Sequence, residues 1–153
     1  MLTIYRLELH KDYVTEVQKA TQTTTKFGLE PTHGLFGSPE WWEHIRNGTL
    51  SVHHLRGRIS RVHMGSMNDW PEFTRRAEDD QEFTWSRYAN CPELGRLYTL
   101  WRLIEVDYVV QRHRVTSFGA GTHVSIPIAI CVAEHFREDG ESGEKHTWAV
   151  ERD

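Results

Sequence analysis

The sequence predicts an α+β protein that is mainly β. The expected architecture is a small curled antiparallel sheet, or an OB-like or SH3-like barrel, of about five strands with one or two short N-terminal helices. In residues 104–110 and 124–132, apolar residues recur at every second position, which is the period of a strand with one buried face. Further short strand patterns follow one another closely from residue 56 onward, which is typical of a small barrel or a tightly curled sheet.

The first third of the chain is expected to hold one strand and two helices. Residues 2–9 read as the strand, and Asp12 is placed to cap a short helix. That helix is expected to fade in residues 21–25, where three threonines run together, because β-branched residues are poor helix formers. Residues 26–37 contain three glycines and a proline and are expected to form a connector.

A second helix, over residues 39–47, has signals at both ends. Ser38 can cap it and Pro39 occupies the first position, where a proline is tolerated. Gly48 supplies a left-handed stop. Of the two adjacent tryptophans, Trp41 and Trp42, one is expected in the core and the other at best half buried, because they point about a quarter turn apart.

The remaining strands follow from alternation and turn composition. The run 56–62 is expected to contain a bulge near Ser60 and Arg61. Residues 72–74 and 82–84 form a hairpin, residues 94–97 one helical turn, and residues 102–111 the longest strand. Pro127 indicates that the last strand lies at an edge or carries a bulge. The predicted core consists of Ile59, Val62, Phe83, Val106, Tyr108, Ile126, Ile128 and Ile130.

Composition fits one folded domain. The chain has 153 residues, of which 38% are hydrophobic and 26% charged. We expect a single domain over residues 1–137, with the barrel core at about 53–133, and a charged, mobile tail over 138–153. Charged residues interrupt the first apolar run, and no stretch is long enough to span a bilayer. We therefore expect a cytoplasmic location and no membrane partner.

No chemical motif predicts catalysis. The two cysteines are not paired in a C-x-x-C motif, and no G-x-S-x-G is present. The ten histidines lack the spacing of metal ligands, and the adjacent His53 and His54 would point to opposite faces of a strand. No catalytic residue, metal ligand or cofactor is predicted. A histidine- or metal-dependent enzyme stays an alternative, because catalytic groups converge only in three dimensions.

One segment is predicted to contact a partner: the loop 64–71, which combines a tryptophan, two methionines and turn-forming residues. Tryptophan is enriched at interface hot spots, and methionine adapts to partner surfaces. The alternative is that the tryptophan folds back and plugs one end of the barrel. The predicted partner-binding residues are Met64, Met67, Asn68, Asp69 and Trp70.

A second set of residues could form a basic face beside Trp85 or Tyr88. Basic residues interleaved with aromatic ones suit single-stranded nucleic acid, because bases stack and phosphates pair. The alternative is a solvated rim balanced by Glu105 and Asp107. The candidate nucleic-acid-binding residues are Arg56, Arg58, Arg61, Arg112 and Arg114.

These observations favour a small non-enzymatic protein-binding domain, such as an inhibitor, an immunity protein or an adaptor. The expected partner is another protein. The second reading is a nucleic-acid-binding small β-barrel, which the arginines favour and the net charge of −4 opposes. The sequence leaves the identity of the partner and the oligomeric state open.

Overall fold

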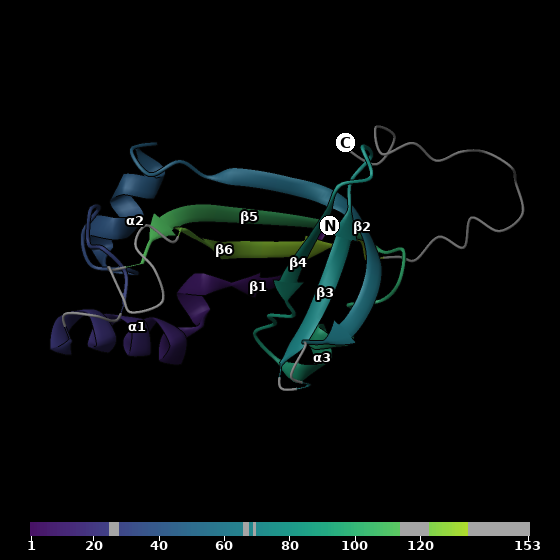
Figure 1. The fold of residues 1–153 in the computed structure, drawn as a ribbon, viewed down its shortest axis with the longest axis horizontal. Helices are drawn as coiled ribbons and strands as arrows, with labels where there is room; N and C mark the ends of the chain where they lie inside the picture. The colour runs from purple at the N-terminus through teal and green to yellow at the C-terminus, as the bar shows by residue number, and fades with distance from the viewer. Residues whose placement is uncertain (25–27, 66–67, 69, 114–122, 135–153) are drawn as a thin grey trace, which may run out of the picture. The chain divides into compact units, whose positions relative to one another are not determined.

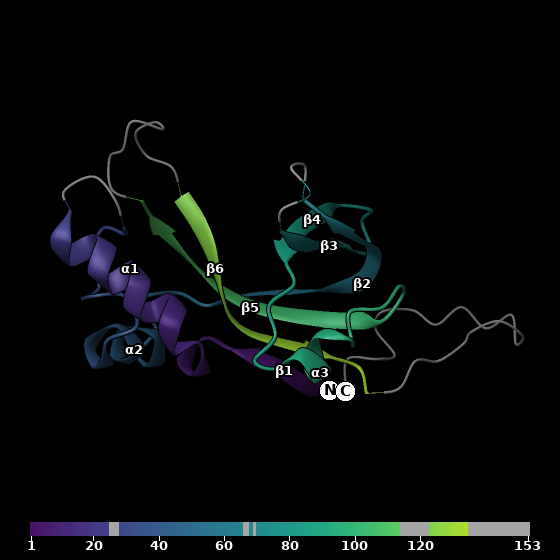
Figure 2. The same cartoon turned by 90° about the horizontal axis from the view of Figure 1, so that it is seen from below.

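A computed structural model describes residues 1–24, 28–65, 68, 70–113 and 123–134 (Figures 1 and 2). The helices and strands are, in chain order, β1 Leu2–Arg6, a 3-10 helix η1 Leu7–Leu9, α1 Lys11–Thr23, α2 Pro39–Arg46, β2 His53–Met64, β3 Pro71–Arg76, β4 Glu82–Ser86, α3 Pro92–Gly95, β5 Leu103–Arg112 and β6 His123–Val132.

The strands form a six-stranded antiparallel open sheet in the order β1-β6-β5-β2-β3-β4, and the described residues also contain three α-helices. The α+β, mainly β class is confirmed. Of the two expected architectures, the sheet is present and the closed barrel is not, because β1 and β4 stand at the two ends of the strand order.

The chain divides into two compact units. Unit 1 contains Met1–Ile4, Leu55–Glu105 and Cys131–Asp153, and unit 2 contains Tyr5–His54 and Val106–Ile130. The strands β1, β2, β5 and β6 each contribute residues to both units.

In unit 2, the ring of Phe36 contacts aromatic rings on both α1 and α2. Its centroid lies 5.9 Å from that of Tyr13 on α1 and 4.9 Å from that of Trp41 on α2. The buried indole of Trp41 donates a hydrogen bond to the side-chain oxygen of Gln111 on β5 (2.9 Å). A buried indole N–H needs such a partner, so this bond fixes α2 against the strand.

The start of the chain departs from the expectation. The first strand ends at Arg6 rather than at residue 9, and the 3-10 turn η1 leads directly into α1. The helix is capped at His10, whose carbonyl accepts from the N–H of Val14 (3.2 Å), so the prediction of Asp12 as the cap is wrong. Asp12 lies instead in the first turn, where the helix dipole favours a carboxylate.

The helix α1 ends at Thr23, within residues 21–25, where the sequence predicts that it fades, but Thr21 and Thr23 are still helical. The hydroxyl of Thr21 donates to the carbonyl of Val17 (2.9 Å) and accepts from the N–H of Leu29 (3.2 Å). Thr21 is buried. Tertiary contacts thus outweigh the weak intrinsic preference of β-branched residues.

The prediction for α2 is confirmed. Ser38 caps it by accepting from the N–H of Trp41 (3.3 Å), and Gly48 adopts φ +80° just beyond its end. Trp41 is fully buried and Trp42 is half buried, as expected for adjacent helical residues that point about a quarter turn apart.

In unit 1, β2, β3 and β4 form an antiparallel ribbon (Figure 1). The register of β2 against β3 shifts between Ile59 and Arg61, which confirms the bulge. The hairpin of β3 and β4 is present as expected. The buried apolar side chains of this unit are Ile4, Ile59, Phe73, Tyr98, Leu103, Ile104 and Val132.

The predicted core is correct in part. Ile59, Val106, Ile126 and Ile130 are buried, whereas Val62, Tyr108 and Ile128 are half buried. Phe83 is 42% exposed, so its assignment to the core is wrong. Phe83 lies on β4, and this strand has a neighbour on one side only.

One further prediction about strands is wrong and another is wrong in part. The longest strand is β2, with 12 residues, rather than β5, with 10. Pro127 lies in β6, between β1 and β5 in the strand order, so the edge alternative is wrong, whereas the alternative of a bulge stays a prediction.

Candidate functional site

The predicted contact loop closes the hairpin of β2 and β3. Met64 and Pro71 are the last register pair of the two strands. Inside the loop, the N–H of Gly65 donates to the carbonyl of Trp70 (2.7 Å), and the N–H of Asn68 donates to the carbonyl of Gly65 (2.8 Å). Asn68 adopts φ +55°, a conformation that asparagine tolerates better than most residues. The backbone bonds therefore hold the two ends of the loop together.

Side chains reinforce the base of this loop. A terminal nitrogen of Arg87 donates to the carbonyl of His63 (3.2 Å) and contacts the sulfur of Met64 (3.8 Å). The ring of His63 is hydrogen-bonded to the hydroxyl of Thr74 (3.1 Å), which in turn bonds the hydroxyl of Thr84 (3.0 Å). These bonds connect β2, β3 and β4, so they hold the base of the loop in place.

Two large apolar side chains in the described part of the loop are exposed. Trp70 is 51% exposed and Met64 is 40% exposed, so Trp70 is not the buried plug of the alternative reading. Asn68 is also exposed. Met67 and Asp69 lie outside the described residues. The assignment of these five residues to a partner contact stays a prediction.

A second exposed apolar site was missed from the sequence. Leu100 and Trp101 are adjacent, and Trp101 is 52% exposed with φ +67°. Its N–H donates to the carbonyl of Ile59 (2.7 Å), and its carbonyl accepts from Arg58 (2.9 Å). A bulky residue held in this backbone region is strained, and such strain concentrates at functional sites. No sequence pattern predicts that a tryptophan adopts a left-handed backbone conformation.

The candidate basic residues are partly neutralised. Arg56 forms an ion pair with Glu105, as the alternative of a balanced rim expects, and Arg58 donates to the backbone of Trp101. Arg61 is exposed. The β2 register pairs Arg58 with Arg76 and Arg61 with Thr74, and the bulge between them keeps both arginines on one face.

The remaining two candidate arginines are Arg112 and Arg114. Arg112 belongs to unit 2 and is exposed, and Arg114 lies outside the described residues. Nucleic-acid binding by this set of residues stays a prediction.

Further ion pairs involve the sheet. Arg76 on β3 and Glu82 on β4 face each other at 2.8 Å. The hydrogen bond to Glu82, followed by its negative charge, raises the pKa of Arg76 above its ordinary value. In unit 2, Asp107 forms an ion pair with His54, and Tyr108 stacks on His53 with ring centroids 5.1 Å apart. The two adjacent histidines thus point to opposite faces, as predicted.

Within the described ranges, no group of three or more His, Cys, Asp or Glu residues is placed to hold a metal ion. The enzyme alternative receives no support from this geometry and stays a prediction. None of the helices in the described part of the chain is long and apolar enough to cross a membrane.

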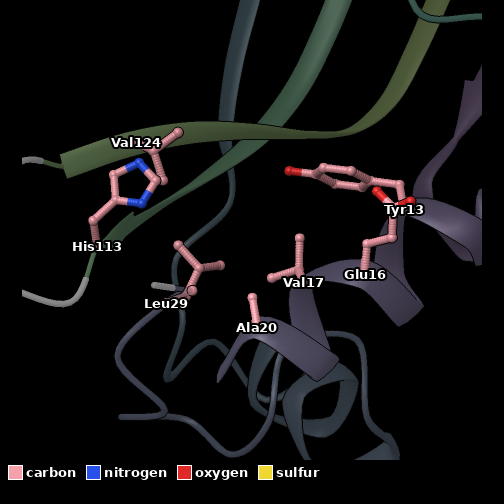
Figure 3. A pocket seen from close by; sticks show the side chains of 8 residues that line it. Tyr13, Glu16, Val17, Ala20, Leu29, His113 and Val124 are labelled. Carbon is pink, nitrogen blue, oxygen red and sulfur yellow. The ribbon is translucent and has the colours of Figure 1, made fainter. Parts of the chain in front are cut away.

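Unit 2 contains a cavity of about 330 Å³ between α1 and the adjoining ends of β5 and β6 (Figure 3). Tyr13, Val17 and Ala20 reach it from α1, while His113, just after β5, and Val124 on β6 approach from the other side. Glu16, Gly28 and Leu29 complete its lining. The sequence did not reveal this cavity, because its walls come from four separate stretches of chain.

Residues 1–133 match the model of a protein family described as immunity protein RhsI2. This range includes every helix and strand from β1 to β6. No curated protein matches the chain.

Proposed function

The chain belongs to the immunity protein RhsI2 family, and from this premise we propose that it binds a toxin protein and so protects the cell that makes both. An immunity protein that acts by binding needs a surface complementary to its toxin and no catalytic group of its own. We further propose that the loop 64–71 contacts the toxin and that the protein acts in the cytoplasm.

The observation that carries the loop assignment is the exposure of Trp70 on a fixed base. Its side chain is 51% exposed, while its carbonyl is held by Gly65 at 2.7 Å. A large aromatic side chain on an ordered backbone loses little conformational entropy on binding, so most of its burial contributes to affinity. Met64 adds an adaptable apolar neighbour at the closing pair of the hairpin.

The toxin is identified by a pull-down from the native host with mass spectrometry. A growth assay then shows whether the captured protein is toxic on its own and harmless when this chain is co-expressed. Capture of a non-toxic protein would contradict the immunity proposal. Fractionation of host cells tests the cytoplasmic location in the same strain.

Trp70→Ala is expected to weaken toxin binding by about thirtyfold or more, as the loss of a central tryptophan commonly does. The melting temperature should change little, because half of the side chain is already in water. Leu9→Ala is the matched control, since Leu9 is 60% exposed and lies in unit 2. Unchanged affinity, or a large drop in melting temperature, would show that Trp70 has a structural role instead.

A further inference from the structure

The strand β4 ends the sheet order and pairs with β3 on one side only (Figure 1). An edge strand leaves a row of backbone N–H and C=O groups that can pair with another strand. Natural sheets often protect such an edge with proline, lysine or a bulge. Residues 82–86 contain no proline and no lysine, and their register with β3 is unbroken.

The hydrogen-bond pattern identifies which backbone groups of β4 face outward. The N–H of Ala77 donates to the carbonyl of Gln81 (3.0 Å), and the N–H of Arg87 donates to the carbonyl of Pro71 (3.0 Å). Hydrogen-bonded pairs alternate with non-bonded pairs in an antiparallel ladder. The register therefore turns the backbone groups of Phe83 and Trp85 toward β3.

The intervening residues Glu82, Thr84 and Ser86 turn their backbone groups to the open side of β4. The carbonyl of Ser86 accepts from the N–H of Tyr88 (3.0 Å). The N–H groups of Glu82, Thr84 and Ser86, and the carbonyls of Glu82 and Thr84, make no hydrogen bond within the described part of the chain. Five groups on one edge match the pairing pattern of a short added strand.

The side chains of β4 leave this edge accessible. Glu82, Phe83 and Thr84 are all exposed. The guanidinium carbon of the buried Arg75 lies 5.0 Å from the centre of the Phe83 ring, so the ring rests on a fixed cation. The carboxylate of Glu82 is paired with Arg76, which reduces the repulsion that a lone charge would exert on an approaching strand.

The edge is also continuous with the loop 64–71. Ser86 pairs with Glu72, the second residue of β3. The next residue, Arg87, bonds the carbonyl of Pro71 and contacts the sulfur of Met64. A partner seated on the loop would therefore meet the open side of β4 at its Ser86 end.

We propose that the toxin docks by adding one extended segment of its chain to the open edge of β4. This inference rests on the proposed immunity function and names the contact that supplies its backbone recognition. The segment pairs with Glu82, Thr84 and Ser86 and places an apolar side chain beside Phe83. Backbone pairing supplies affinity, while the neighbouring Phe83 and Trp70 select the side chains of the partner.

Amide hydrogen exchange tests the inference directly, with the toxin captured from the native host as the probe. In the free protein, the amides of Phe83 and Trp85 should exchange slowly and those of Glu82, Thr84 and Ser86 quickly. Saturating toxin should slow the outward amides by about tenfold or more. If the toxin binds but these amides still exchange quickly, the edge inference is wrong and the immunity function stands. Absence of any toxin binding would overturn both.

A pair of variants isolates one outward N–H. Both Thr84→Pro and Thr84→Ala remove the hydroxyl bond to Thr74, but only the proline also removes the outward N–H. Thr84→Pro should bind the toxin about tenfold more weakly than Thr84→Ala at similar melting temperature. Equal affinities would contradict the proposal. If the outward amides slow as the concentration of this protein is raised without toxin, the edge pairs with a second copy of the chain. That result would overturn the toxin assignment.

Discussion

At the scale of single residues, Gly57 is the position in β2 where a side chain has no room. A Cβ atom there would lie 2.5 Å from the backbone oxygen of Arg76 and 2.8 Å from the Cγ of Arg75. The terminal nitrogen of Arg75 also donates to the carbonyl of Arg56 (2.6 Å). The absence of a side chain at Gly57 thus lets the stem of Arg75 cross β2 at close range.

Gly57→Ala is therefore expected to lower the free energy of unfolding by about 1–3 kcal/mol, the usual cost of overpacking. Gly95→Ala is the matched control, because its Cβ would meet only the Cβ of Ala89 at 3.8 Å. Urea unfolding of both variants measures the difference. Equal free energies of unfolding would mean that β2 and β3 can move apart near Gly57 at little cost. That result would contradict the close packing seen at this position.

At the scale of elements, the helix α2 shows how local signals and one tertiary contact combine. Ser38, Pro39 and Gly48 define its ends from the sequence alone. Its orientation depends on the bond from Trp41 to Gln111, two residues 70 positions apart in the chain. The ends of an element are thus local properties, whereas the face that it buries is decided by its partner.

Ser38→Ala should destabilise the protein by about 0.5–2 kcal/mol, because the N–H of Trp41 loses its capping acceptor. Thermal unfolding compared with Ser51→Ala, an exposed serine outside the helices and strands, gives the measurement. Equal melting temperatures for Ser38→Ala and the control would show that water satisfies the N–H of Trp41 as well as the Ser38 side chain does.

At the scale of the whole molecule, the family match ends at residue 133, close to the end of β6 at Val132. Residues 134–153 carry seven acidic and three basic residues. A chain that ends at residue 137 is expected to melt within a few degrees of the full chain, because no predicted core residue follows Ile130. A loss of cooperative unfolding on truncation would contradict the predicted domain over residues 1–137.

The role of the acidic tail can be separated from folding in the same truncated chain. If the tail steers a basic toxin, its removal slows association at low salt and leaves the dissociation rate unchanged. The full chain measured at high salt is the control, because screening removes the same long-range attraction.

The general function could be anticipated only as a class. A protein-binding role, with an immunity protein among three alternatives, followed from the missing catalytic motifs, the aromatic loop 64–71 and the acidic tail. The family match supports the immunity alternative. Residue patterns could not select it, because a protein interface has no fixed spacing comparable to that of metal ligands or a nucleophile motif.

The sequence by itself determined what depends on neighbours along the chain. The cap at Ser38, the bulge after Ile59 and the hairpin of β3 and β4 all follow from a few adjacent residues, and all are confirmed. Turn chemistry and the two-residue period of a strand act over short distances, so they can be read without knowing the fold.

The tertiary structure alone decided what depends on distant partners. Phe83 and Ile59 have similar strand patterns, but Phe83 is exposed on β4 and Ile59 is buried in a strand with neighbours on both sides. The interior position of Pro127 and the strained backbone of Trp101 likewise depend on which strands lie beside them. Burial is a property of the strand order, and pairings between residues far apart in the chain set that order.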